Sequence, residues 1–265
     1  MSDKSKIEWT DSTWNPITGC TPASEGCRNC YAKAMAERFP RVHSGDGAIR
    51  KFSDVTFHPE RLDQPLRWRK PRKIFVCSMG DLFHSEAYID WLSDIWDIMI
   101  RCPQHTFLIL TKRADNMRSL LSPPNPCLPT LPNVWLGVTC ENQRTANERI
   151  PILLDTPAAM RFVSVEPMLE EINIKHYLEC NKSISECHAR PLYPDCNPIT
   201  KLCRNNVDWV ICGAETGAHK RPCKPEWIDF LRQQCAAAGV PFFGKKDSQG
   251  QAIMPRQFPA STKQP

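Results

Sequence analysis

Residues 106–115 read TFLILTKRAD, a continuously apolar run that ends in a threonine and two basic residues before a helical pattern begins. Such runs are typical of strands that are covered on both faces of a parallel sheet, and the polar residues mark the strand end. The same pattern recurs along the chain. The other apolar runs are Lys73–Cys77, Val134–Val138, Arg161–Val165, Trp209–Cys212 and Pro241–Gly244.

Helical patterns lie between these runs. Helices are expected over Ala32–Phe39, Tyr88–Arg101, Asn142–Leu154 and Glu226–Ala238. Gly239 is placed to end the last of them. Alternating strands and helices imply βαβ units, and a further strand near Ile7–Thr10 would bring the total to six or seven. The sequence therefore predicts an α/β fold, a partial (β/α)6-type TIM-like barrel, with polar strand ends gathered at one edge.

The composition indicates a folded protein outside membranes. Of the 265 residues, 41% are hydrophobic, which suffices for a large core. The apolar runs fall short of the roughly 18 residues of a membrane span, and MSDKSKIEWTDSTW lacks a signal-peptide stretch, so we expect a cytoplasmic protein with no membrane partner. The formal net charge of +5 permits a polyanionic partner without requiring one.

The strand–helix pattern is interrupted once. We expect the barrel to span residues 1–250 and to carry a cysteine-rich insertion at residues 173–206, on its rim near the active site. Residues 251–265 are polar and contain prolines, and we expect them to form a loosely held tail.

Fourteen cysteines in a chain without a signal peptide favour metal binding over disulfides. Three of them, Cys20, Cys27 and Cys30, form a C-x6-C-x2-C motif. Thiolates suit iron–sulfur clusters or zinc. A [4Fe–4S] cluster on three cysteines leaves one iron open, whereas structural zinc takes four ligands, and the nearest histidine, His43, lies beyond a predicted helix. The motif favours a cluster, with zinc and a purely structural role as alternatives.

The insertion carries a second group of cysteines, separated by six, eight and six residues. They are Cys180, Cys187, Cys196 and Cys203. Their spacing is not that of common zinc modules. Zinc, a second iron–sulfur cluster and no metal all stay open for them.

Several segments of the chain together resemble a known family. IEWTDSTWNPITGC (7–20) and GCRNCYA (26–32) resemble the opening of a phage- and bacteria-encoded family described as a domain of unknown function. SMGDLFH, LTKR, GVTCEN, RFVSVEP, VDWVICGAETG and CAAAGVPFFGK follow in the family's order, so the resemblance covers about residues 6–246 apart from the insertion. The family resembles a divergent branch of the radical S-adenosylmethionine superfamily, distantly similar to spore photoproduct lyase. The superfamily's usual motif is C-x3-C-x2-C, and this chain departs from it in the longer first gap.

The resemblance implies a [4Fe–4S] cluster on Cys20, Cys27 and Cys30, bound S-adenosylmethionine, and a low-potential electron donor of the flavodoxin type. The strand-end residues that it assigns to S-adenosylmethionine are Ser78, Met79, Gly80, Asp81, Thr111, Lys112, Glu141, Asn142, Arg144 and Glu166. Asp81 would accept hydrogen bonds from the methionine ammonium, or else cap a helix. Lys112 or Arg113 would pair with the methionine carboxylate or a substrate phosphate, or else form a solvated basic pair.

The remaining strand-end residues are assigned to the substrate or to hydrogen return. They are Arg113, Glu215, Lys245, Lys246, Cys140 and Cys212. Glu215 lies in a turn of small residues that could approach adenine or the substrate, and the two lysines could face a substrate anion. The two cysteines are candidates to return a hydrogen atom to the product radical.

The leading functional hypothesis is a radical enzyme that abstracts hydrogen from a nucleotide or nucleic-acid base. Its concrete form is isomerisation or rearrangement of a hypermodified thymidine in phage DNA. The basic stretches LRWRKPRK (66–73) and HKRPCK (219–224) could follow a phosphate backbone. Two alternatives stay open: a zinc-containing nucleic-acid-binding protein without catalysis, and a radical enzyme that acts on an amino acid or cofactor precursor.

Overall fold

The computed structural model describes residues 5–39, 48–122, 128–179, 206–217 and 219–260, and a seven-stranded sheet forms its centre. Neighbouring strands are parallel throughout, and their order in space is their order along the chain. The strands are β1 Ser12–Trp14, β4 Lys73–Val76, β5 Thr106–Thr111, β6 Val134–Thr139, β7 Met160–Val165, β8 Trp209–Cys212 and β9 Phe242–Gly244.

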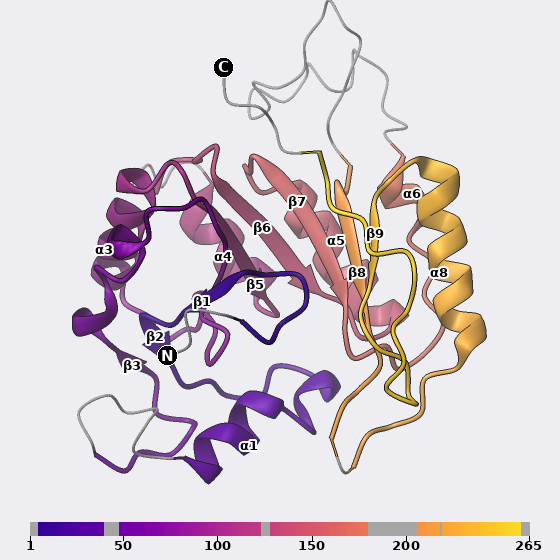
Figure 1. The fold of residues 1–265 in the computed structure, drawn as a ribbon, viewed down its shortest axis with the longest axis horizontal. Helices are drawn as coiled ribbons and strands as arrows, with labels where there is room; N and C mark the ends of the chain where they lie inside the picture. The colour runs from indigo at the N-terminus through magenta and orange to yellow at the C-terminus, as the bar shows by residue number, and fades with distance from the viewer. Residues whose placement is uncertain (1–4, 40–47, 123–127, 180–205, 218, 261–265) are drawn as a thin grey trace, which may run out of the picture.

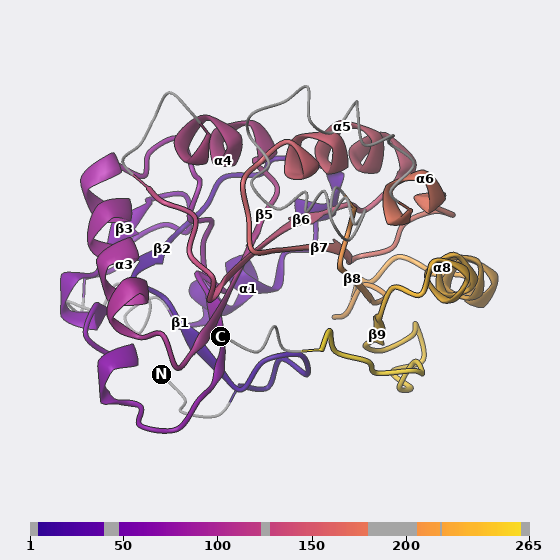
Figure 2. The ribbon, with the colours of Figure 1, turned by 90° about the horizontal axis from the view of Figure 1, so that it is seen from above.

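The sheet curls, and helices cover its convex side (Figure 1, Figure 2). These helices are α3 Ile89–Arg101, α4 Ala114–Leu121, α5 Gln143–Leu154, α6 Lys175–Leu178 and α8 Pro225–Ala238. Strands β1 and β9 form the two edges of the sheet. The fold is therefore the partial TIM-like barrel predicted from the sequence, with seven strands. Among the described residues, no helix is long and apolar enough to cross a membrane.

Alternation along the strands divides the core into two hydrophobic clusters. In β5, Phe107 and Ile109 pack toward the helices, whereas Leu108 and Leu110 face the concave side. The concave cluster contains aromatic rings from β4, β6, β7, β8 and β9, and Trp9 lies within it, with its ring centroid 4.8 Å from that of Phe75. The amino-terminal end of the barrel is thus filled, which leaves the carboxyl-terminal end for polar groups.

Most predicted elements are confirmed. The six predicted apolar strands and the four predicted helices differ from the observed ones by at most one residue at either end. Gly239 ends α8 in the left-handed region, with φ of 67°, where a side chain would be strained.

The prediction for the first strand is wrong. Residues 7–10 contribute Ile7 and Trp9 to the concave cluster, and the strand that pairs with β4 is Ser12–Trp14. Helices α4 and α6 were not predicted, nor was the short antiparallel pair of β2 Ile17–Thr18 with β3 Thr56–Phe57.

The described ends of segment 173–206 lie away from the expected rim. Ile174 N donates to Gln234 Oε1 of α8 at 2.7 Å, and Val207 N donates to Tyr177 O at 2.9 Å. The described residues on both sides of the insertion, up to 179 and from 206, therefore lie close together just before β8, at the amino-terminal end of the sheet. The second cysteine group, Cys180, Cys187, Cys196 and Cys203, lies outside the described residues. His43 lies outside them as well.

The polar segment that begins at Gln251 is not loosely held through Phe258. Trp209 Nε1 donates to Gln257 O at 2.9 Å, and Arg256 Nη2 donates to Glu8 Oε1 at 2.9 Å. The Phe258 ring centroid lies 5.4 Å from that of Trp209. This segment therefore lines edge strand β9 and connects it to the N-terminal segment.

Candidate active site

The three cysteines of the predicted cluster lie in one loop, residues 20–30, which we call the three-cysteine loop. It begins after Gly19, which forms a parallel bridge with Gly80, and it ends at Cys30, directly before helix α1, Tyr31–Arg38. Its backbone and side chains form hydrogen bonds with residues that follow β4, β5, β6 and β8. The loop therefore lies across the carboxyl-terminal end of the curled sheet, where such folds place their active sites.

The thiols in this loop differ from the other described ones. All three are free and partly exposed, whereas the six remaining described cysteines are buried. Those buried residues are Cys77, Cys102, Cys140, Cys212, Cys223 and Cys235. The exposed thiols are the ones available as ligands.

Arg113 holds one side of the loop. Its guanidinium donates through Nη2 to Thr21 O at 2.8 Å and through Nη1 to Cys20 Sγ at 3.4 Å and Asp81 Oδ2 at 3.1 Å. Thr111 Oγ1 donates to Asp81 Oδ1 at 2.8 Å and so fixes this carboxylate. Burial, followed by the charge of Asp81, raises the pKa of the Cys20 thiol to about 11, and Arg113 opposes that rise.

Glu141 holds the middle of the loop from below. It is fully buried, its Oε2 pairs with Arg149 Nη1 at 2.9 Å, and its Oε1 accepts from Gly26 N at 3.4 Å. A Cβ at Gly26 would lie 3.0 Å from the Glu141 Cδ atom, so any larger residue here requires the Glu141 side chain to shift by a few tenths of an ångström. Burial would raise the pKa of Glu141, but the charge of Arg149, with smaller contributions that include the charge of Lys112, outweighs it and holds the pKa below its usual value.

Glu215 holds the other side of the loop. Its carboxylate pairs with Arg221 Nη2 at 2.6 Å and accepts from Asn29 Nδ2 at 2.9 Å, while Arg221 also pairs with Glu25 Oε1 at 3.2 Å. Burial acts to raise the pKa of Glu215, but the hydrogen bonds from Arg221 and Asn29 lower it to about 2. The loop is therefore braced by three carboxylate–arginine pairs.

These contacts give a role to residues that the resemblance assigned to ligands. Asp81 and Glu141 were predicted to bind S-adenosylmethionine, and Arg113 and Glu215 the substrate. In the structure their charged groups contact each other, their arginine partners or the three-cysteine loop. Their roles toward S-adenosylmethionine and substrate stay predictions.

The segment of Ser78, Met79 and Gly80 lies next to this loop. Asn15 Oδ1 accepts from Met79 N at 2.9 Å and from Ser78 Oγ at 3.1 Å, and Tyr31 Oη donates to Ser78 O at 2.6 Å. The segment is therefore positioned from β1 and from α1 at once.

Two residues predicted to bind S-adenosylmethionine have other partners. The Asn142 side chain caps α5 by accepting from Thr145 N at 2.9 Å. Arg144 is exposed on α5 and pairs with Glu148. The structure does not bring the Arg144 side chain to the three-cysteine loop.

The two candidates for hydrogen return point away from the concave side. Cys140 and Cys212 belong to the cluster under the helices, and Cys212 Sγ lies 3.8 Å from the sulfur of Met168. Alternation along the chain accounts for this placement, because Ser164 and Ile211 are the concave-side residues at that level. Lys246 is exposed at the start of the segment that pairs with Ala252.

Glu166 and Lys245 form a further ion pair at the carboxyl ends of β7 and β9. Both side chains are partly exposed, at 25% and 20% respectively. On the same strand and face as Glu166, the buried Ser164 Oγ has no hydrogen-bond partner among the described residues. This pair therefore stands apart from the bracing pairs and leaves polar groups open to a ligand.

Sequence reasoning missed three residues that complete the bracing of the loop: Asn29, Arg149 and Arg221. Arg149 carried a weak signal, because a basic residue at an inward-facing position of an amphipathic helix needs a partner. Arg221 was noted only as part of a basic stretch.

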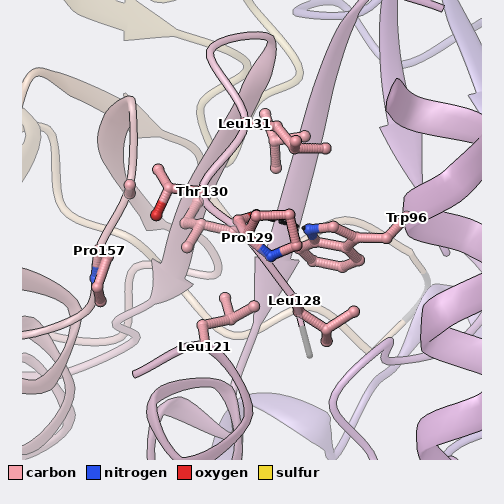
Figure 3. Close-up of a pocket in the computed structure, with 10 residues that line it drawn as sticks. Trp96, Leu121, Leu128, Pro129, Thr130, Leu131 and Pro157 are labelled. Carbon is pink, nitrogen blue, oxygen red and sulfur yellow. Dashed lines mark hydrogen bonds between the residues drawn. The ribbon is translucent and has the colours of Figure 1, made fainter. Parts of the chain in front are cut away.

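A small hollow lies elsewhere, between α3, α4 and β6 (Figure 3). Its lining is apolar apart from Thr130 and includes Trp96, Leu121 and Val134. It lies on the helix side of the sheet and holds no charged residue, so we do not assign chemistry to it.

The three-cysteine loop suits an iron–sulfur cluster by its donor set. In the described part of the chain, no three His, Cys, Asp or Glu side chains converge enough to share one metal ion. A cubane binds each thiolate through a different iron, so its ligands stand farther apart than those of a single ion. Three accessible thiols in one braced loop are consistent with that requirement.

The chain belongs to a family described as "Protein of unknown function (DUF5131)", whose model matches residues 4–260. Among solved structures it is similar to two of spore photoproduct lyase, a cysteine-to-serine variant and a tyrosine-to-phenylalanine variant. Each is 10% identical, with a TM-score of 0.54, and the match covers 91% of this chain and 78% of that chain. No curated protein matches the chain. These findings confirm the resemblance drawn from the sequence, and at this identity the solved structures show the fold alone.

Proposed function

We propose that this chain is a radical S-adenosylmethionine enzyme in which Cys20, Cys27 and Cys30 hold a [4Fe–4S] cluster. The observation that carries the proposal is the braced loop of accessible thiols across the carboxyl-terminal end of a partial barrel. Such a cluster supplies reductive cleavage of S-adenosylmethionine to a 5′-deoxyadenosyl radical, which abstracts hydrogen from an unreactive carbon. The electron donor in this proposal is a low-potential protein of the flavodoxin type.

In this proposal the protein's own residues position and shield the reactants. The three carboxylate–arginine pairs keep the loop in place before any cofactor binds, which lowers the entropy cost of assembling the site. The aromatic cluster around Trp9 fills the barrel below, so the site is closed to water from the amino-terminal end.

For the substrate, the proposal is a nucleotide or nucleic-acid base, with rearrangement of a hypermodified thymidine in phage DNA as the specific reaction. Its support is the likeness to a lyase that acts, by its name, on a photoproduct. The basic stretches add little support. Residues 66–73 end at the first residue of β4 and so lie at the opposite end of the sheet, and Arg221 of the second stretch is paired with Glu215.

A small-molecule substrate is the second candidate. Glu166 and Lys245 present one negative and one positive group, both partly exposed, at the carboxyl ends of their strands. Such a pair matches the zwitterion of an amino acid. The carboxylate of the amino acid would pair with Lys245 and its ammonium with Glu166, so that two ion pairs replace one.

The test is to purify the chain without oxygen and to count iron, sulfide and zinc per chain. We expect about four irons and four sulfides. Cleavage of S-adenosylmethionine should follow reduction, first alone, then with modified DNA or free amino acids. Stoichiometric zinc without iron would overturn the proposal and favour the nucleic-acid-binding alternative.

A pair of variants sharpens this test. Cys27→Ala should lose the iron and the cleavage, because one ligand of the cluster is removed. Cys187→Ala should keep both if the second cysteine group is separate. About eight irons in the wild-type chain, falling to about four in Cys187→Ala, would assign a second cluster to the insertion.

A further inference from the structure

Cys20 and Cys27 differ in what contacts their sulfur atoms. Cys20 Sγ receives a guanidinium N–H from Arg113 at 3.4 Å, whereas Cys27 Sγ receives a backbone N–H from Ala23 at 3.4 Å. The Arg113 contact brings a positive charge to one thiolate position. Charge and hydrogen bonds at cluster sulfurs are among the main determinants of a cluster's reduction potential.

Arg113 is held so that this contact is fixed. Its Nη1 also donates to Asp81 Oδ2 at 3.1 Å, and its Nη2 donates to Thr21 O at 2.8 Å and to Thr21 Oγ1 at 3.1 Å. Its side chain is 13% exposed and that of Asp81 is 7% exposed, so solvent screens the charge weakly. A planar guanidinium can make all of these contacts at once, which a lysine ammonium on its flexible stem cannot reproduce.

Asp81 is fixed in turn by the end of β5. Thr111 Oγ1 donates to both of its carboxylate oxygens, at 2.8 and 3.0 Å, and Phe83 N donates to Oδ1 at 3.0 Å. The chain of contacts therefore runs from a strand end through a buried carboxylate to a guanidinium and then to a sulfur atom.

The other bracing pairs lack this last step. Arg221 donates to Glu215 and Glu25, and Arg149 donates to Glu141 and Thr139 O. Arg221 and Arg113 thus hold opposite sides of the same loop, but only the contacts of Arg113 include a ligand sulfur.

Resting on the function proposed above, we infer that Arg113 is a positioning residue that raises the reduction potential of the cluster through its N–H contact with the Cys20 thiolate. Reduction adds negative charge to the cluster, so a nearby fixed cation stabilises the reduced form more than the oxidised form. Asp81 keeps the guanidinium in register, and Thr111 keeps Asp81.

The test measures the midpoint potential of the cluster in the reconstituted full chain, together with iron per chain. In Arg113→Gln we expect a more negative midpoint and a several-fold lower ratio of reduced to oxidised cluster at a fixed solution potential. The matched control is Arg221→Gln, which removes a brace without removing a sulfur contact and should keep the wild-type midpoint. Arg113→Lys should lie between wild type and Arg113→Gln.

Each other outcome overturns the inference. A wild-type midpoint in Arg113→Gln would show that the contact does not act on the cluster. Equal shifts in Arg113→Gln and Arg221→Gln would assign the effect to loop bracing in general. If Arg113→Gln binds no iron, Arg113→Lys decides, and a wild-type midpoint there would overturn the inference. Absence of iron from the wild-type chain would instead overturn the proposed function itself.

Discussion

At the scale of single residues, the site is organised by carboxylates that each have their own arginine. Asp81, Glu141 and Glu215 follow β4, β6 and β8, which are alternate strands of the sheet. A buried carboxylate without a partner is costly, and pairing it with an arginine removes that cost while fixing its direction. The sequence located these three residues at strand ends, but it could not identify their partners, which lie on other segments.

The Glu215 pair makes the folding stability of the chain depend on pH. The folded-state pKa of Glu215 is about 2, below its unfolded value, so its contribution is fully present above the unfolded pKa and is lost as pH falls toward 2. We expect Glu215→Gln to be less stable than wild type at pH 7, with a difference that shrinks between about pH 5 and pH 2. Denaturant unfolding at several pH values measures this difference.

The control for this experiment is Glu148→Gln, which removes an ion pair that is 51% exposed on its carboxylate side. Exposed pairs of this kind contribute roughly 0–1 kcal/mol, so its stability should stay near that of wild type throughout. A difference between wild type and Glu215→Gln that does not change with pH would contradict the assigned pKa.

At the scale of elements, the apolar runs that form buried parallel strands were predictable because burial on both faces leaves an unbroken signal. The position of β1 was predicted wrongly because Ser12–Trp14 is short and largely polar. The apolar residues just before it, Ile7 and Trp9, lie inside the barrel instead. Helix α6 was missed because it is only four residues long. Tertiary packing determines the secondary structure of these two segments, and the local sequence pattern does not report that packing.

The close packing of the three-cysteine loop on β6 predicts an effect of Gly26→Ala. The new Cβ would lie 3.0 Å from the Cδ atom of Glu141, which cannot withdraw because it is buried and paired with Arg149. We expect the loop to move, with a loss of the iron that the proposed function assigns to it and a destabilisation of about 1–3 kcal/mol. Iron analysis and denaturant unfolding measure the two effects.

A second substitution tests the cause of this effect. Glu141→Asp shortens the carboxylate and makes room, so the double variant should bind more iron than Gly26→Ala alone, which is a coupling between neighbours. Additive losses in the double variant, or wild-type iron and stability in Gly26→Ala, would show that this contact does not set the loop position.

At the scale of the whole molecule, the two ends of the barrel have different tasks. The carboxyl-terminal end carries the three-cysteine loop and the ion pairs, and the amino-terminal end is filled by aromatic side chains. The regular strand–helix order predicted the first assignment. The sequence did not predict where the insertion is attached. Residues 180–205 follow the short helix α6 and precede β8, so their attachment lies at the amino-terminal end of the sheet, and α6 was too short to be predicted.

The C-terminal segment closes that filled end and should contribute to stability rather than to chemistry. The Phe258 ring centroid lies 5.0 Å from that of Phe243, and Lys73 Nζ lies 4.5 Å from the Phe258 centroid, so this ring connects the strands near both edges of the sheet. We expect Phe258→Ala to lower the free energy of unfolding by about 1–2 kcal/mol, because the ring is 39% exposed and loses only part of its packing.

The control Ile49→Ala, at a side chain that is 70% exposed, should cost less than about 0.5 kcal/mol. The iron content expected from the proposed function should be unchanged in both variants, since the three-cysteine loop is at the other end. Equal stability of the two variants would mean that the segment only lies on the surface, and a loss of iron in Phe258→Ala would mean that the two ends of the barrel are coupled.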